Sequence, residues 1–170
     1  EKLLVIAGKI SNQKHMASIK NAFYTLMPVI LTGAFCTLIS NVVCSTTTEG
    51  ISLAKLPGMS WLGIFTDLFT ACNYATLNFF TIAAVFLIGM ELAKQNGMGD
   101  SPDSGVVAVC SYVATLSTRV TTTVDDVEVT VTNVISSDYT ASRGLFLGMI
   151  IALVSVEIYS AIPKSHVFDF

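Results

Sequence analysis

The sequence predicts an all-α membrane protein with about four transmembrane helices, an N-terminal amphipathic helix, a short interfacial helix and a small β-rich external loop. Hydrophobic residues make up 52% of the chain and charged residues only 12%, whereas soluble domains carry about 25% charged residues. The mean hydropathy is +0.68. This charge content argues against a soluble helical domain, and recovery of the chain in a detergent-free soluble fraction would contradict the membrane assignment.

The net charge of −3 provides no basic field, and the chain has no arginine-rich stretch. We therefore expect no nucleic-acid partner. The four cysteines lack paired spacing such as C-x-x-C, so we expect small apolar residues and neither a metal site nor a disulfide. Metal ions and cofactors are not expected. The four cysteines are Cys36, Cys44, Cys72 and Cys110.

Residues 1–21 are predicted to form a cytoplasmic amphipathic leader, with apolar side chains on one face and lysines that reach lipid headgroups. The first span follows over residues 22–43, which carry no charge. At about 1.5 Å per residue this segment crosses a hydrocarbon layer of about 30 Å. Pro28 lies inside it and predicts a kink, because proline removes one backbone donor.

A loop is expected over residues 44–60, which are rich in threonine, glycine and proline. Trp61 then opens a moderately apolar stretch to about residue 75, which we interpret as a short interfacial or re-entrant helix. The second span is predicted over residues 76–93. It ends at Lys94 and a glycine-rich loop that breaks the helix.

The third predicted span, residues 105–118, is borderline in length and ends before Arg119. Residues 120–140 are rich in alternating β-branched side chains and carry Asp125, Asp126 and Glu128, which favours an exposed hairpin-like excursion. The last span covers residues 144–162. Residues 22–162 thus form one four-span membrane scaffold, and residues 163–170 are expected to begin a cytoplasmic connection to a further half of the protein.

The distribution of lysine and arginine orients this scaffold, because these residues accumulate in short cytoplasmic loops. Four spans place six of them on one side and three on the other, so we predict that both ends lie in the cytoplasm. The larger group is Lys2, Lys9, Lys14, Lys20, Lys94 and Lys164, and the smaller is Lys55, Arg119 and Arg143.

Ionisable residues in spans suggest pairing or function. Glu91 is expected to form a local ion pair with Lys94, one helical turn away. Glu157 either bonds a neighbouring helix or, together with Tyr159, coordinates a polar substrate; both alternatives stay open. Asn78 adds an amide to the second span and is a further weak candidate for substrate binding.

Small residues recur at every fourth position in the last span, at Gly144, Gly148 and Ala152. Such a face lets another helix approach closely, so we interpret these residues as helix-packing positions. Gly33 begins a similar small-to-polar stripe on the first span with Thr37 and Asn41. This stripe either joins helices or borders a hydrophilic path.

No catalytic constellation is visible in the sequence. The two histidines, His15 and His166, lie outside the predicted spans and lack a nucleophile partner, zinc spacing or a phosphate-binding glycine loop. We therefore expect a solvated role for both of them.

Three stretches resemble a known family, the IIC component of the lactose/cellobiose type in the bacterial phosphotransferase system. They are the basic leader and first span over residues 12–35, the Gly97–Gly105 turn with Asp100 and Pro102, and the glycine-led last helix over residues 142–162 with its Glu-Ile-Tyr. Family members are longer, and the missing initial methionine also hints at a part of a longer protein.

The resemblance implies the N-terminal half of a sugar permease in the bacterial cytoplasmic membrane, embedded in lipid and dimeric. The whole protein would take up a β-linked disaccharide such as cellobiose, coupled to phosphorylation by the IIA and IIB components. The present helices would supply scaffold and dimer contacts, and the sugar-binding residues would lie in the second half. The alternative is a free-standing helical membrane protein with an assembly or channel role.

Overall fold

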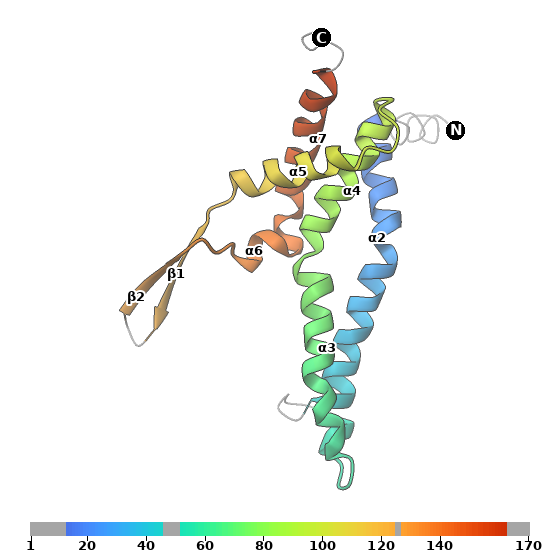
Figure 1. The fold of residues 1–170 in the computed structure, drawn as a ribbon. Coiled ribbons are helices and arrows are strands. Elements are labelled where there is room, and N and C mark those ends of the chain that lie inside the picture. The colour runs from blue at the N-terminus through green and yellow to red at the C-terminus, as the bar shows by residue number, and fades with distance from the viewer. Residues whose placement is uncertain (1–12, 46–51, 125–126, 163–170) are drawn as a thin grey trace, which may run out of the picture. The chain divides into compact units, whose positions relative to one another are not determined.

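The computed structural model describes residues 13–45, 52–124 and 127–162. Contacts divide the chain into two compact units: unit one comprises residues 1–26 and 81–170, and unit two comprises residues 27–80. Helix α2, Lys14–Ile39, runs from the first unit into the second without interruption at Pro28 (Figure 1). The helix therefore begins before the predicted start of the first span, and residues 14–21 continue directly into that span. The rest of the predicted leader, residues 1–12, lies outside the described residues.

Unit two consists of the remainder of α2 and a second helical stretch. A π-helical turn, Ser40–Cys44, extends α2. After a short 3-10 turn at Leu53–Lys55, the chain forms one continuous helical run of three types: a 3-10 segment Ser60–Phe65, the α-helix α3 over Thr66–Asn73 and a π-helical segment Tyr74–Asn78. The stretch predicted as a short helix is therefore helical and longer than expected, and its interfacial or re-entrant position stays a prediction.

Unit one contains the remaining helices and the hairpin. Helix α4 spans Phe80–Gln95, α5 spans Pro102–Thr115, α6 spans Ser137–Thr140, a 3-10 turn covers Ser142–Gly144 and α7 spans Leu145–Ala161. The predicted second span, residues 76–93, begins in the π-helical segment and continues through α4. Residues 163–170, predicted as the start of a connection, lie outside the described residues.

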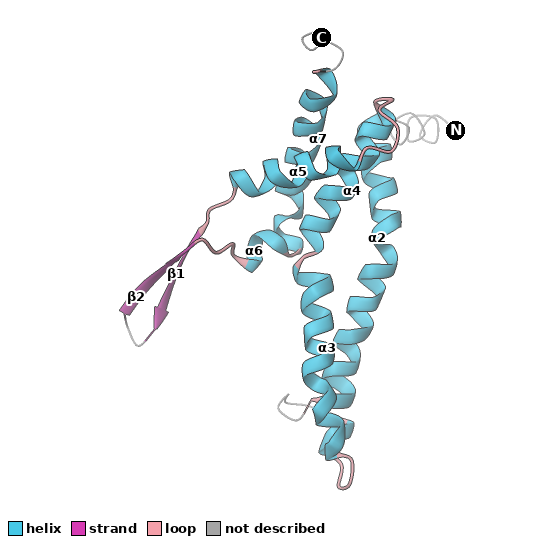
Figure 2. Cartoon of the chain, in the orientation of Figure 1, coloured by secondary structure: helices cyan, strands magenta, loops and turns pink. Residues whose placement is uncertain are grey.

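The predicted excursion forms an antiparallel hairpin. Strand β1, Arg119–Val124, pairs with β2, Val127–Thr132, with Arg119 opposite Thr132. In unit one the hairpin projects away from the helices (Figure 2). Both strands consist mainly of threonine and valine, β-branched residues that favour strands, and most of the side chains described on the hairpin are exposed. The short helix α6 was not predicted; the Ser136 side chain caps it by accepting from Asp138 N at 3.3 Å.

The turn between α4 and α5 is built from glycines. Gly97 adopts a φ of +85°, and the amides of Gly97 and Met98 donate to the carbonyls of Lys94 and Ala93 at 3.1 and 3.0 Å. This is the pattern that ends a helix on a left-handed glycine. Pro102 then stands in the first turn of α5, where its missing amide hydrogen is not needed.

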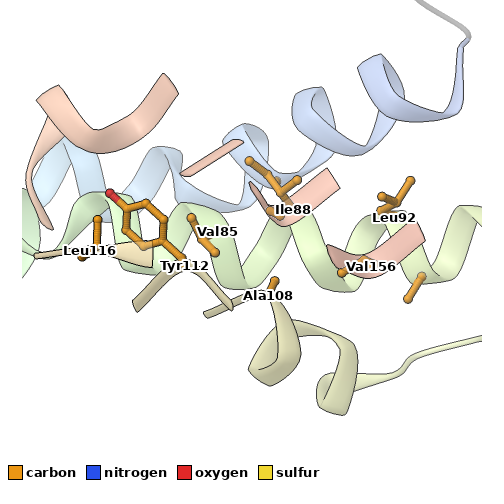
Figure 3. Close-up of a cluster of buried hydrophobic side chains, with 10 residues drawn as sticks. Val85, Ile88, Leu92, Ala108, Tyr112, Leu116 and Val156 are labelled. Atoms are coloured by element: carbon orange, nitrogen blue, oxygen red, sulfur yellow. The ribbon is translucent and has the colours of Figure 1, made fainter. Parts of the chain in front are cut away.

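The core of unit one lies where α4, α5 and α7 meet. Gly105 on α5 permits this close approach, because a Cβ there would lie 2.7 Å from the Phe86 ring on α4. The buried side chains, drawn in Figure 3, include Val85, Ile88 and Leu92 from α4, Ala108, Tyr112 and Leu116 from or just after α5, and Val156 from α7.

The outward faces of the long helices remain apolar. Phe35 on α2 is 64% exposed and Phe146 on α7 is 71% exposed, and further large apolar residues share these faces. In water such surfaces would be unfavourable, whereas lipid tails are as apolar as these side chains. The exposed faces therefore agree with a protein embedded in a bilayer.

Two helical stretches among the described residues are long and apolar enough to cross a membrane: 14–44 and 142–161. The stretches 60–78 and 80–95 pass the same test as one broken span, which would make three. Helix α5 has only 14 residues and falls short of the about 20 that a span needs. Spans one and four of the predicted four are thus supported, and the crossing of residues 105–118 stays a prediction.

Candidate functional site

Polar side chains from three parts of unit one meet near the start of α2 and the end of α7. The Lys14 Nζ atom lies 2.5 Å from Glu157 Oε1 and donates a hydrogen bond to Asn96 Oδ1 at 3.1 Å. The Asn96 amide in turn donates to Ser160 Oγ at 3.1 Å. We call these four residues, together with His15, the Lys14 cluster. It connects α2, the end of α4 and α7 by polar contacts.

Two basic side chains lie beside the Glu157 carboxylate in this cluster. His15 Nδ1 lies 3.6 Å from Glu157 Oε1, so protonation of the imidazole would add a second cation beside the carboxylate. Within the described residues neither of these two atoms makes a hydrogen bond of good geometry. The close Lys14–Glu157 contact is therefore an ion pair and not an aligned hydrogen bond. About half of the Lys14 side chain remains exposed, so solvent weakens the pair.

The space beside the cluster is small. A cavity of about 120 Å³ is lined by Lys14, Asn96, Glu157, Ser160 and Ala161. Pockets for organic ligands begin at about 300 Å³, so this cavity has room for water molecules and not for a disaccharide. The other side of Glu157 borders a groove of about 390 Å³ whose further lining includes Leu153, Val154 and Ile158. That apolar lining offers few partners for sugar hydroxyls.

Tyr159 has a different partner from Glu157. Its hydroxyl donates to Asp103 Oδ2 at 2.6 Å, which ties α7 to the first turn of α5. The Ser101 hydroxyl also donates to Asp103, at Oδ1. Hydrogen bonds from Ser101 and then from Tyr159 hold the pKa of Asp103 below its usual value. Because residues two positions apart do not share a helix face, the structure does not bring Glu157 and Tyr159 together around one ligand.

The predicted ion pair between Glu91 and Lys94 is wrong. Glu91 Oε2 instead accepts a hydrogen bond from the Asn21 side chain on α2 at 3.1 Å. Lys94 pairs with Asp100 at 3.3 Å. The physical reason is the glycine turn after α4, which returns Asp100 to Lys94, while Glu91 lies on the face of α4 that meets α2.

The small residues of α7 form one buried face. Gly144, Gly148 and Ala152 are all buried, and the same face continues at Val156 and Ser160. A Cβ at Gly148 would lie 2.7 Å from Val85 Cγ2 on α4, and one at Gly144 would lie 2.1 Å from the Tyr139 carbonyl oxygen. Helix α7 thus approaches its neighbours at positions where no larger side chain fits without movement.

Tyr112 fixes the same region from α5. Its side chain is fully buried, and its hydroxyl donates to the carbonyl oxygens of Tyr139 at 2.7 Å and Gly144 at 3.3 Å. Thr81 on α4 adds a hydrogen bond to the Ala141 carbonyl at 2.5 Å. These bonds satisfy buried backbone oxygens in the segment that leads into α7.

In unit two the candidate residues line the contact between α2 and the α3 segment. Gly33 faces Thr76 and Leu77 so closely that a Cβ would lie 2.5 Å from Thr76 Oγ1. Asn78 lies half-buried in the same π-helical segment. The stripe that continues from Gly33 borders a polar pocket of about 190 Å³, lined by Thr37, Ser40, Asn41, Thr70 and Asn73.

Hydrogen bonds cross this pocket. The Asn73 amide donates to Thr37 Oγ1, and the hydroxyls of Ser40 and Thr70 lie 3.4 Å apart. The side chains that sequence analysis placed on a small-to-polar stripe therefore contact α3 and also enclose polar space. Both alternatives for the stripe, joining helices and bordering a hydrophilic path, agree with this geometry.

Several contact residues could not be identified from the sequence. Asn96 and Asp103 stand in or beside a predicted loop, and only the fold brings them to α2 and α7. The basic charge of Lys14 beside the predicted span marked it as a candidate for an interaction, but the sequence did not identify Glu157 as its partner. In the described part of the chain no group of three histidine, cysteine or acidic side chains could hold a metal ion.

The family described as "Phosphotransferase system, EIIC" matches residues 20–168. The chain belongs to this family. The lichenan permease IIC component of Bacillus subtilis is 30% identical over 98% of this chain and 36% of its own length. The cellobiose-specific EIIC component of Geobacillus stearothermophilus is 25% identical over the same shares of the two chains. The expected lactose/cellobiose type of EIIC is confirmed.

A solved structure agrees with this assignment. The transporter ChbC, the IIC component of an N,N'-diacetylchitobiose-specific phosphotransferase system, superposes with a TM-score of 0.75 at 26% identity and covers 95% of this chain and 36% of its own. The EIIC chain described here is therefore a multi-pass integral membrane protein of the phosphotransferase type. It spans about a third of the length of the relatives that it matches.

Proposed function

We propose that this EIIC chain is the N-terminal part of a permease that takes up a β-linked disaccharide such as cellobiose. The IIB and IIA components would phosphorylate the sugar. The observation that carries the proposal is the family match over residues 20–168, together with the ChbC likeness over 95% of the chain. The names of the relatives refer to lichenan, cellobiose and diacetylchitobiose, and all three are built from β-linked sugars.

Within this permease, the described helices would act as a scaffold. Contacts between helices are prominent in unit one: the small-residue face of α7, the Tyr112 hydrogen bonds and the Lys14 cluster all join helices to each other. The apolar outer faces of α2 and α7 would contact lipid or a second copy of the protein in a homodimer. Sugar recognition would then depend mainly on residues outside this chain.

The orientation proposed is that both ends of the chain lie in the cytoplasm, with the β1–β2 hairpin outside. The excess of lysine on one side of the predicted spans supports it. A short epitope tag inserted between β1 and β2 tests it: an antibody should reach the tag in intact spheroplasts. Detection only after the membrane is permeabilised would reverse the assignment.

Uptake measurements test the transport proposal. Cells that express the permease with its cognate IIA and IIB components should accumulate phosphorylated cellobiose, and cells that lack IIB should not. A candidate panel of lactose, cellobiose and diacetylchitobiose identifies the sugar. Failure to transport any β-linked disaccharide, although the protein is present in the membrane, would contradict the proposal.

The alternative is a free-standing helical membrane protein with an assembly or channel role. The exposed apolar faces of α2 and α7 would serve such an assembly, because they offer a surface to a second chain. The reading frame and the neighbouring genes distinguish the permease from the free-standing protein. A reading frame that continues into further spans, or neighbouring IIA and IIB genes, supports the permease, whereas a stop after residue 170 with no such neighbours supports the alternative.

A further inference from the structure

Two cysteines of unit two meet between α2 and α3. The sulfur atoms of Cys36 and Cys72 lie 2.9 Å apart, although the residues are separated by 36 positions in the chain. Both are free thiols; Cys36 is 7% exposed, and Cys72 is half-buried. The sequence predicted four unrelated apolar cysteines, whereas the fold brings Cys36 and Cys72 into contact.

We propose that Cys36 and Cys72 are an oxidisable dithiol and that their disulfide joins α2 covalently to α3. A disulfide needs an S–S distance of about 2.05 Å, so closure requires an approach of less than about 1 Å. The bond would hold together two helical segments that otherwise share only hydrogen bonds and packing.

The polar pocket of unit two lies beside the two chain segments that carry this pair. It is lined by Thr37 and Asn73, each of which directly follows one of the two cysteines, and by Ser40, Asn41 and Thr70. Its volume of about 190 Å³ and its hydroxyl and amide groups suit ordered water. Water can accept the thiol proton, and the thiolate is the nucleophile in exchange chemistry. Cys72, the more exposed of the two, is the first thiol to react.

A low-molecular-weight disulfide is the oxidant in this proposal. The Cys72 thiolate attacks one sulfur of the oxidant, forms a mixed disulfide and releases the other sulfur as a thiolate. The Cys36 thiol loses its proton to water, and its sulfur then attacks Cys72 Sγ and releases the second oxidant thiolate. Two protein thiols are oxidised to one disulfide, and one disulfide of the oxidant is reduced to two thiols.

Peptide mapping of the full-length protein in native membranes tests the proposal. The membranes are treated with 2-hydroxyethyl disulfide. The protein is then denatured in the presence of excess N-ethylmaleimide, which blocks the remaining free thiols, and digested without reductant. We expect a linked pair of peptides containing Cys36 and Cys72, lighter by two hydrogens than their sum and separated by dithiothreitol. Cys44 and Cys110 should each carry either maleimide or a mixed disulfide with the oxidant, and neither should be linked to another cysteine. Recovery of maleimide on both Cys36 and Cys72 after oxidation would overturn the proposal.

Two variants provide matched controls. The double variant Cys44→Ala/Cys110→Ala keeps the pair and should give the same linked peptides, whereas Cys36→Ala should leave Cys72 in a mixed disulfide with the oxidant. Linkage of Cys72 to Cys110 in the wild type would also overturn the proposal. The wild-type peptide map is decisive by itself, so the test survives if a variant fails to fold.

Discussion

Lys14, the first residue of α2, lies 2.5 Å from the carboxylate of Glu157 near the end of α7. The contact joins two helices, α2 and α7, that among the described residues are each long and apolar enough to span a membrane alone. Asn96, just after α4, completes the connection through Lys14 and Ser160. One basic residue thus links three helical segments at one end of unit one.

Glu157→Gln separates a structural role from a substrate role. Both partners are about a third or more exposed, so loss of the pair should cost at most about 1 kcal/mol of stability. We expect a small decrease in melting temperature in detergent and unchanged sugar uptake. Lys14→Gln is the matched control, because it removes the same ion pair without changing the carboxylate. Uptake that falls in Glu157→Gln but not in Lys14→Gln would assign Glu157 to the substrate.

Gly148→Val tests the close approach of α7 to α4. The added Cβ would lie 2.7 Å from Val85 Cγ2 and 3.0 Å from Thr81 Cγ2, and Thr81 is held by its hydrogen bond to Ala141. Overpacking of this kind costs about 1–3 kcal/mol, so the folded protein should melt earlier in detergent. Phe146→Leu on the exposed face of the same helix should have little effect. Equal stability of the two variants would show that α7 does not pack by this face.

Tyr112→Phe removes one hydroxyl from the core of unit one. The Tyr139 carbonyl oxygen then loses the hydrogen bond that the Tyr112 hydroxyl donates at 2.7 Å. An unsatisfied buried polar group costs about 1–3 kcal/mol. We expect lower thermal stability and faster proteolysis in the segment between β2 and α7. Tyr74→Phe is the control because Tyr74 is 55% exposed. A Tyr112→Phe variant as stable as this control would contradict the hydrogen bond.

The sequence was sufficient for those elements that depend on local composition. Apolar length revealed the α2 and α7 spans, and alternating β-branched residues revealed the hairpin. The division between leader and span is not visible in the helix itself: residues 14–21 of the predicted leader and the first span form the single helix α2.

Contacts between distant segments could not be predicted in the same way. The Glu91–Lys94 pair followed from helical spacing, yet Asn21 and Asp100 are the actual partners because the glycine turn redirects the chain. The meeting of Cys36 with Cys72 likewise depends on how α2 and α3 pack. Helical periodicity places a residue on a face, and only the fold determines which residue lies opposite.

Asp103→Asn should reduce stability in a pH-dependent way. Hydrogen bonds from Ser101 and Tyr159 lower the pKa of Asp103 in the folded state, whereas in the unfolded chain it is about 3.9. A lowered pKa stabilises the fold fully above the unfolded pKa, and this contribution is lost as the pH falls through the folded pKa. The wild type should therefore be more stable than Asp103→Asn at pH 7 and lose that advantage below about pH 3.9.

The measurement for Asp103 is the difference in melting temperature between the wild type and Asp103→Asn in detergent, recorded from pH 7 down to the acid limit of folding. Asp138→Asn is a suitable comparison, since Asp138 pairs with Arg143 at 2.7 Å on an exposed surface and not with a helix of the core. A difference for Asp103→Asn that grows as the pH falls would reverse the sign of the proposed linkage. Such a result would mean that the neutral acid, and not the carboxylate, is the form that the hydroxyls of Ser101 and Tyr159 stabilise.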